Sequence, residues 1–189
     1  MNLNYNLILA SKSPRRQELL TKLDLKFEVK VKSIDESYPS DLVKTLVAEY
    51  LAKKKSKAFG ILGVEDLLIT SDTTVVFNNE VLEKASSATE AKEMLSTLSG
   101  KTHEVITGVC LRTNKNQTSF SEVTEVKFKN LSEFEIEYYI HNYSPFDKAG
   151  AYGIQEWIGM IGIEWINGDF YNVMGLPLFR LYNELKKFS

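Results

Sequence analysis

Residues 7–20 read LILASKSPRRQELL, an apolar run that meets polar residues and a proline. The run at 7–10 predicts a strand, and Ser13 followed by Pro14 is typical of a helix N-cap and first helical position. The apolar residues beyond them have the spacing of one helix face: Leu19, Leu20 and Leu23. The chain therefore opens with a strand, a turn and a helix.

Helical and strand patterns alternate along the rest of the chain. Strands are predicted at 27–31, 67–77, 105–111 and 120–128, and helices at 42–51, 88–99, 133–141 and from Pro177 onward. Capping-box patterns at 87–90 and 132–135 begin two of these helices, and Asn167-Gly168 predicts a hairpin with a type I′ turn. We expect an α/β fold in which helices flank a mixed twisted sheet, with residues 1–189 as a single domain.

Composition and charge narrow the class of protein. With 43% hydrophobic residues among 189, the chain has enough apolar side chains for a core, which excludes a disordered protein. Its 23 basic and 25 acidic residues give a net charge of -2, which argues against a nucleic-acid-binding surface. No run approaches the roughly 20 apolar residues of a membrane span, and no leader pattern opens the chain. We expect a cytoplasmic protein without nucleic-acid or membrane partners.

Cysteine and histidine, which often carry catalysis, are few in this chain. The single cysteine, Cys110, lies in an apolar run and has no partner for an intrachain disulfide. We predict an inert core thiol, which fits a reducing compartment. His103 and His141 have neither a metal-ligand spacing nor an evident nucleophile partner, so we interpret them as structural or surface residues.

Two arginines in the first turn of the first predicted helix break a local rule. The helix dipole favours acidic side chains there, yet the sequence has Arg15 and Arg16. Two guanidinium groups beside free backbone N–H groups would form a site for phosphate oxygens. The alternative is that both arginines pair with surface carboxylates such as Glu18, and this motif alone leaves both interpretations open.

A carboxylate lies within the apolar strand predicted at 67–77. Residues 71–74, Ser-Asp-Thr-Thr, separate its two apolar ends, so we expect Asp72 and Thr73 at a strand end or a bulge. A carboxylate near a core is costly unless it is paired or bound to a metal, which favours a functional site over a structural Asx turn. Glu36, between a strand and a helix, is a weaker candidate of the same kind.

Further candidates follow later in the chain. Lys84 and Lys148 would add positive charge for a bound triphosphate, whose negative charges require several cations and a divalent metal. Each lysine alone is equally typical of a solvated surface. Gln155 has the donor and the acceptor that contact with a nucleobase edge requires, and it equally fits a turn cap. The sequence has no Walker or dinucleotide-binding glycine pattern.

Together these segments resemble the Maf family of nucleoside triphosphate pyrophosphatases. The matching segments lie at 9–16, 71–73, 83–84, 98–103, 147–155 and 175–178, in the family order and across essentially the whole chain. The resemblance implies a fold related to that of inosine triphosphate pyrophosphatases, with two lobes, a central cleft and frequent homodimers. It also implies cleavage of a nucleoside triphosphate to the monophosphate and pyrophosphate, with Mg²⁺ or Mn²⁺ as the divalent metal.

The resemblance also implies roles for individual residues. Asp72 corresponds to the proton acceptor and Glu36 lies beside the metal or the attacking water, so we expect both to be metal ligands. The expected substrate-binding residues are Ser11, Arg15, Arg16, Lys55, Thr73, Lys84, Lys148 and Gln155. Arg15, Thr73 and Gln155 resemble the branch that acts on dTTP and UTP, so we expect a dTTP/UTP pyrophosphatase that serves nucleotide-pool housekeeping.

Some positions depart from the family pattern. Three neighbours of candidate residues differ: Ala85 for proline, Ser56 for alanine and Glu156 for a frequent glycine. Lys53 and Lys54 stay as alternatives to Lys55. Two other functions also stay open: a pyrophosphatase for modified or purine nucleotides, and a nucleotide-binding regulator linked to septum formation.

Overall fold

The structure is a computed structural model that describes residues 3–188. In this range, strand pairing gives one sheet in the order β2-β1-β3-β5-β6-β7, and β4 pairs with β3. The strands are β1 (Asn6–Leu9), β2 (Phe27–Val29), β3 (Asp66–Phe77), β4 (Glu80–Leu82), β5 (Thr102–Arg112), β6 (Gln117–Phe128) and β7 (Ile163–Asn167). Strand β1 is parallel to β2 and β3, whereas β4 is antiparallel to β3 and β7 to β6. The predicted mixed sheet is confirmed.

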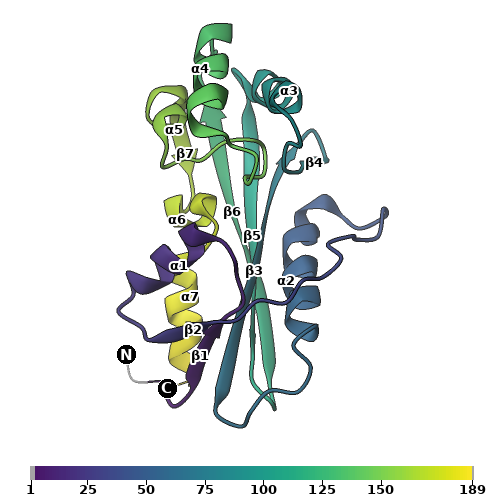
Figure 1. Cartoon of the computed structure of the whole chain (residues 1–189), viewed down its shortest axis with the longest axis vertical. Helices are drawn as coiled ribbons and strands as arrows, with labels where there is room; N and C mark the ends of the chain where they lie inside the picture. The colour runs from purple at the N-terminus through teal and green to yellow at the C-terminus, as the bar shows by residue number, and fades with distance from the viewer. Residues whose placement is uncertain (1–2, 189) are drawn as a thin grey trace. The chain divides into compact units, whose positions relative to one another are not determined.

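The helices complete the α/β architecture shown in Figure 1. They are α1 (Pro14–Thr21), α2 (Val47–Lys57), α3 (Ala88–Leu98), α4 (Glu133–Tyr143), α5 (Trp157–Gly162), α6 (Phe170–Met174) and α7 (Leu178–Leu185), with short 3₁₀ turns η1 (Lys44–Leu46) and η2 (Lys186–Phe188). Ser13 caps α1 with Pro14 at its start, as the sequence predicts, and the box at 132–135 begins α4. At α3 only half of the predicted box forms, because the Glu90 carboxylate accepts from the Ser86 backbone N–H instead of that of Ser87.

The chain divides into two compact units. Unit 1 comprises the described parts of Met1–Asp72, Thr107–Glu122 and Gly175–Ser189, and unit 2 comprises Thr73–Ile106 and Val123–Met174. Strands β3, β5 and β6 contribute residues to both units. The single domain over 1–189 and the central cleft stay predictions, and the end residues 1, 2 and 189 lie outside the described range.

In unit 1, helices cover both sides of the strands. Figure 1 shows α2 on one side and α1 with α7 on the other. Helix α2 approaches β5 closely, because a Cβ atom at Gly108 would lie only 2.3 Å from the Glu49 backbone nitrogen. The Thr70 hydroxyl of β3 donates to the Ala52 carbonyl of α2 at 2.7 Å. These contacts fix where α2 lies along β3 and β5. They thereby position the α2 side chains of the candidate site.

Three sequence predictions about the elements differ from the structure. Strand β3 runs unbroken from Asp66 to Phe77, so Asp72 lies within the strand and neither at its end nor in an Asx turn. Threonine is β-branched and favours strands despite its polarity. The predicted hairpin at Asn167-Gly168 is absent, because β7 pairs with β6 and the chain continues into α6. The helix predicted from residue 42 begins later, as η1 at Lys44 and α2 at Val47.

The structure also bears on the predictions for cysteine, histidine and membrane-spanning helices. Cys110 is buried, and burial raises the pKa of its thiol, as expected for an inert core residue. Within residues 3–188, no helix has the length and apolar character that crossing a membrane requires. His141 is exposed and His103 is buried, in agreement with surface and structural roles.

His103 lies in a buried aromatic cluster of unit 2. Its Nε2 lies 2.7 Å from the Tyr152 hydroxyl, and its ring packs against Phe128 and Tyr152. Burial lowers the pKa of His103 to about 4, because a charged imidazole would be desolvated there. The folded protein therefore holds this histidine neutral under neutral and mildly acidic conditions.

This arrangement predicts acid sensitivity. The unfolded chain takes up the His103 proton near pH 6.5 but the folded chain only near pH 4, so the stability present above pH 6.5 is lost as the pH falls toward 4. We expect a loss of about 3 kcal/mol from this residue. Urea unfolding at pH 7 and pH 4 checks it, with His103→Gln as the reference. An equal pH effect in both proteins would contradict the prediction.

Candidate active site

The loop between β1 and α1 in unit 1 positions the first candidate residues. The Ser11 hydroxyl accepts from the Ser13 backbone N–H at 3.1 Å, and the Ser13 hydroxyl accepts from the Arg16 backbone N–H at 3.5 Å. Proline at the first helical position restricts the backbone of the turn. This local capping places Arg15 and Arg16 at the start of α1.

Arg16 is held by backbone carbonyls as well as by charge. Its Nε donates to the Gly175 carbonyl at 2.8 Å, and its Nη1 donates to the Ser71 carbonyl at 3.0 Å. Burial lowers the pKa of Arg16, the negative charge of Asp72 opposes that shift, and the charge of Arg15 adds to it. Glu18, the alternative partner, pairs instead with Lys22 at 2.8 Å. The structure thus places Arg16 beside the carboxylate of β3, while Arg15 is half-buried.

Lys55 lies between the two candidate carboxylates of unit 1. Its Nζ donates to Asp72 Oδ1 at 2.5 Å and lies 2.9 Å from Glu36 Oε1. The Asp72 side chain is 12% exposed and that of Lys55 17%, whereas the Glu36 side chain is half exposed. A mostly buried carboxylate is thereby paired, which explains how β3 tolerates Asp72 in mid-strand.

The neighbouring lysines of α2 point elsewhere. Lys53 pairs with Glu49 at 2.7 Å, and Lys54 donates to the Ser37 carbonyl at 2.7 Å. Of the three alternatives that the sequence left open, the structure places Lys55 against Asp72. The helical spacing explains this result, because successive residues on α2 face directions about 100° apart.

The donor set of Glu36 and Asp72 fits a divalent cation. Two carboxylates that share one ammonium group supply the oxygen ligands that Mg²⁺ and Mn²⁺ prefer. Over residues 3–188, no group of three or more His, Cys, Asp or Glu side chains has an arrangement that could hold a metal ion. Magnesium is usually bound by one or two carboxylates together with substrate phosphates and water, so a two-carboxylate set suits a metal that arrives with a nucleotide.

Unit 2 contains the remaining candidates, among them Lys84, which follows β4, and Lys148, which lies in the loop between α4 and α5. Lys84 is exposed and forms an isolated bridge with Ala149, and the Gly150 backbone N–H donates to the Glu83 carbonyl at 3.1 Å. Gly150 has a φ of 66°, and a Cβ atom there would lie 3.0 Å from Val75. The loop that contains Lys148 is therefore fixed against the residues that precede Lys84.

Lys148 is buried and paired with two carboxylates. Its side chain is only 8% exposed, and its Nζ lies 2.8 Å from Asp147 Oδ1 and 3.1 Å from Glu156 Oε1. Glu156 also accepts a hydrogen bond from the Tyr139 hydroxyl, which itself accepts from the Gly153 N–H at 3.0 Å. Burial and the Glu156 charge raise the pKa of Tyr139, so the phenol stays protonated.

Sequence reasoning missed the parts that Glu156 and Tyr139 play in this cluster. The departure of Glu156 from the family glycine was a usable signal, because an added carboxylate beside a buried lysine is a natural partner. Tyr139 gave no such signal, since an aromatic residue on an amphipathic helix is usually interpreted as a core residue.

Thr73 directly follows Asp72 in β3 and is half-buried.

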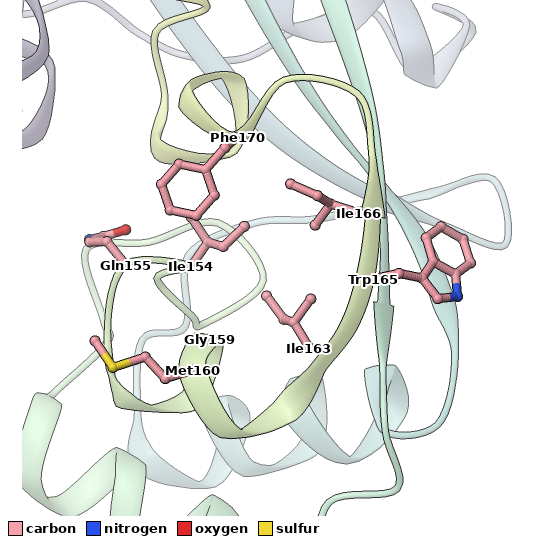
Figure 2. Close-up of a pocket in the computed structure, with 8 residues that line it drawn as sticks. All are labelled: Ile154, Gln155, Gly159, Met160, Ile163, Trp165, Ile166 and Phe170. Carbon is pink, nitrogen blue, oxygen red and sulfur yellow. The ribbon is translucent and has the colours of Figure 1, made fainter.

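Gln155 lines a cavity of unit 2. The cavity has a volume of about 450 Å³, and its other lining residues are apolar side chains and Gly159. Figure 2 shows Gln155 on one side of this space, with Ile154, Ile163, Ile166 and Phe170 around it. The Gln155 Oε1 atom is buried and has no hydrogen-bond partner among the described residues.

Comparison with known proteins identifies a family and close relatives. The family described as Maf-like protein matches residues 6–188. A dTTP/UTP pyrophosphatase of Bacteroides thetaiotaomicron is 51% identical over 185 residues, which cover 97% of this chain and 96% of the relative. A protein of the same name from Phocaeicola vulgatus is 53% identical with the same coverage. The solved structure of a HAM1 protein from Coxiella burnetii has 18% sequence identity to this chain and a TM-score of 0.43. The match covers 66% of this chain and 73% of the HAM1 chain.

Proposed function

Because the chain belongs to the Maf family, we propose that it is an enzyme that hydrolyses dTTP and UTP to the nucleoside monophosphate and pyrophosphate. The observation that carries this proposal is the pairing of Lys55 with Asp72 and Glu36 beside Arg16 in unit 1. The names of relatives at about half identity over nearly their full length support the choice of substrate.

In this proposal Asp72 is the general base. It orients a water molecule and accepts its proton as the water oxygen attacks the α-phosphorus, and the bond to the β-phosphate oxygen breaks to release pyrophosphate. Arg15, Arg16 and Lys55 stabilise the negative charge that builds on the phosphates. Lys55 also holds the Asp72 carboxylate in a fixed orientation through its 2.5 Å contact. No covalent intermediate is required.

Glu36 and Asp72 are proposed to hold Mg²⁺ or Mn²⁺. When bound, the metal supplies positive charge that polarises the phosphate and offsets its developing negative charge. The chain's own part is to present two carboxylate oxygens, one half exposed and one mostly buried. Lys55 balances their charge in the free protein.

The other candidate residues have proposed roles in substrate binding. Ser11 contacts a phosphate, Lys84 and Lys148 add positive charge, and Arg15, Thr73 and Gln155 select the pyrimidine nucleotide. We also propose that residues 1–189 act as one domain, that the protein forms a homodimer and that it works in the cytoplasm. The contacts of Arg16, Lys55 and Asp72 in unit 1 and the unit 2 loop that contains Lys148 support the proposed binding roles.

A substrate panel tests the function. We expect the purified protein, with Mg²⁺ or Mn²⁺, to release pyrophosphate faster from dTTP and UTP than from GTP, ITP or 7-methyl-GTP. Pyrophosphate is measured by a coupled assay and the monophosphate by chromatography. Faster turnover of the purine nucleotides would favour the modified-nucleotide alternative. Tight binding of dTTP without cleavage would favour a nucleotide-binding regulator.

A further inference from the structure

Lys148 is a buried cation whose two partners differ in how firmly they are held. Its Nζ lies 3.1 Å from Glu156 Oε1 and 2.8 Å from Asp147 Oδ1. The Asp147 side chain is 57% exposed, whereas that of Glu156 is only 20% exposed. A lysine side chain has several rotatable bonds, so its ammonium group stays in one place only if its partner is itself fixed. Glu156 is the partner that meets this condition.

The Glu156 carboxylate is fixed by helix α4. Its Oε2 accepts from the Tyr139 hydroxyl, whose oxygen accepts from the Gly153 backbone N–H at 3.0 Å. Tyr139 is fully buried, and a Cβ atom at Gly153 would lie only 2.9 Å from the Glu156 Cδ atom. Figure 1 shows α4 beside α5, and Glu156 is the N-cap residue of α5. Tyr139, Glu156 and Lys148 thus form one chain of contacts, which leads from α4 to the loop before α5.

The loop that these contacts reach has an unfavourable backbone conformation. Gly150 and Ala151 have φ values of 66° and 56°, and alanine seldom adopts positive φ. Such a conformation persists only where the surrounding contacts determine it. Lys148 precedes this stretch and Gly153 follows it, so the chain of contacts holds the loop on both sides.

The groups on either side of position 156 require a carboxylate there. Tyr139 presents an O–H group and Lys148 an N–H group, so both neighbours donate. A carboxylate offers two acceptor oxygens, whereas an amide offers one oxygen and one NH₂ group that only donates. A glutamine of the same size would therefore place its NH₂ group against one of the two donors.

We propose that Glu156 and Tyr139 are positioning residues, which hold the Lys148 ammonium group in place for the phosphates of the nucleotide. The inference rests on the proposed function, which assigns Lys148 to substrate binding. It adds two residues that the resemblance to the family does not supply. Asp147 has a different part, because its exposed carboxylate neutralises Lys148 until a phosphate replaces it.

Neutralising each carboxylate in turn separates positioning from charge. By calorimetry with Mg²⁺ present, Glu156→Gln should weaken the binding of inorganic pyrophosphate about tenfold, because Lys148 loses its fixed orientation. Asp147→Asn should strengthen it about twofold, because the same charge is removed while the orientation stays. With dTTP as substrate, Glu156→Gln should raise KM about tenfold and change kcat less than threefold, as expected when substrate and transition state lose binding equally.

Tyr139→Phe tests the outer link of the chain of contacts. It removes one hydroxyl from a buried position and should weaken pyrophosphate binding about threefold. If both residues act through one chain, the double variant Tyr139→Phe/Glu156→Gln should bind no more weakly than Glu156→Gln alone. The matched control is Tyr138→Phe, at the adjacent, 40% exposed tyrosine of α4, and it should leave the affinity unchanged. All of these changes preserve side-chain size, so the variants are expected to fold, and thermal unfolding checks this.

The outcomes for the proposal and for the enzyme are distinct. Unchanged or tighter pyrophosphate binding by folded Glu156→Gln would overturn the proposal, because charge alone would then describe the surroundings of Lys148. Additive losses in the double variant would overturn it too, since Tyr139 would then act apart from Glu156. A protein that cleaves no triphosphate but shows the expected binding pattern would refute the proposed function and keep the positioning roles. Normal cleavage of dTTP with an unaltered KM in Glu156→Gln would keep the function and refute those roles.

Discussion

Asp72→Asn is expected to lower the kcat for dTTP by more than about 10³-fold. General-base catalysis alone contributes about 10² to 10⁴, and this substitution also weakens one of the two proposed metal ligands. Asparagine has nearly the same size and shape as aspartate, so the packing of β3 is preserved. The amide oxygen can still accept from Lys55 Nζ, which lies 2.5 Å from Oδ1 in the unaltered protein. The loss is therefore one of chemistry and not of fold.

The measurement compares kcat with stability. Pyrophosphate release gives the rate, and circular dichroism with thermal unfolding shows that the variant is folded. Asp66→Asn is the matched control, because Asp66 begins the same strand and its carboxylate accepts from the nearby Gly63 N–H at 3.1 Å. The control should retain kcat within about twofold. Near-normal turnover of folded Asp72→Asn would remove Asp72 from the reaction.

Local signals predicted the parts of the fold that local physics decides. Ser13 and Pro14 begin α1 because a hydroxyl cap and a fixed φ act within four residues. The Ser132 and Glu135 capping box begins α4 for the same reason. Such features depend on neighbours in the sequence and can be read from it directly.

Long-range contacts explain the elements that were predicted wrongly from the sequence. Asp72 stays within a strand because Lys55, from another element, neutralises it, and no local pattern reveals that partner. The Asn167-Gly168 pair looks like a hairpin turn, but Gly168 has a φ of 135° and a Cβ atom there would lie 2.7 Å from Thr124 Oγ1. Glycine is required by close approach to β6, and not by a type I′ turn.

The same distinction between local signals and long-range contacts applies to the candidate site. Sequence resemblance proposed Asp72, Glu36 and a lysine of α2, but helix geometry was needed to choose Lys55 among three adjacent lysines. It also proposed Lys148 without indicating that this lysine is buried against Glu156. The sequence therefore proposes the charged residues, whereas their pairings become visible only in the structure.

Lys55→Met should have the second large effect, in two opposite directions. We expect kcat to fall about 100-fold, because a fixed positive charge beside the phosphates and the orientation of Asp72 are both lost. We also expect the protein to bind Mn²⁺ alone, without nucleotide, about tenfold more tightly. In the unaltered protein the ammonium group lies within 2.9 Å of Glu36 Oε1 and 2.5 Å of Asp72 Oδ1, and it competes with a cation for these oxygens.

The same substitution should make stability depend on the metal. Removing one partner of a mostly buried ion pair leaves an uncompensated carboxylate, which typically costs about 3–5 kcal/mol. Mn²⁺ can replace the lost positive charge, so it should raise the Tm of Lys55→Met more than that of the unaltered protein. Free Mn²⁺ is followed by electron paramagnetic resonance, and Tm by calorimetry with and without metal.

Lys53→Met separates a local effect from a general loss of charge. Lys53 lies on the same helix and pairs with Glu49, away from Asp72, so its removal should change neither Mn²⁺ affinity nor kcat by more than about twofold. Weaker Mn²⁺ binding by Lys55→Met would mean that the ammonium group assists the metal and does not compete with it. The sign of this one change therefore decides whether Glu36 and Asp72 exchange a lysine for a metal or bind both together.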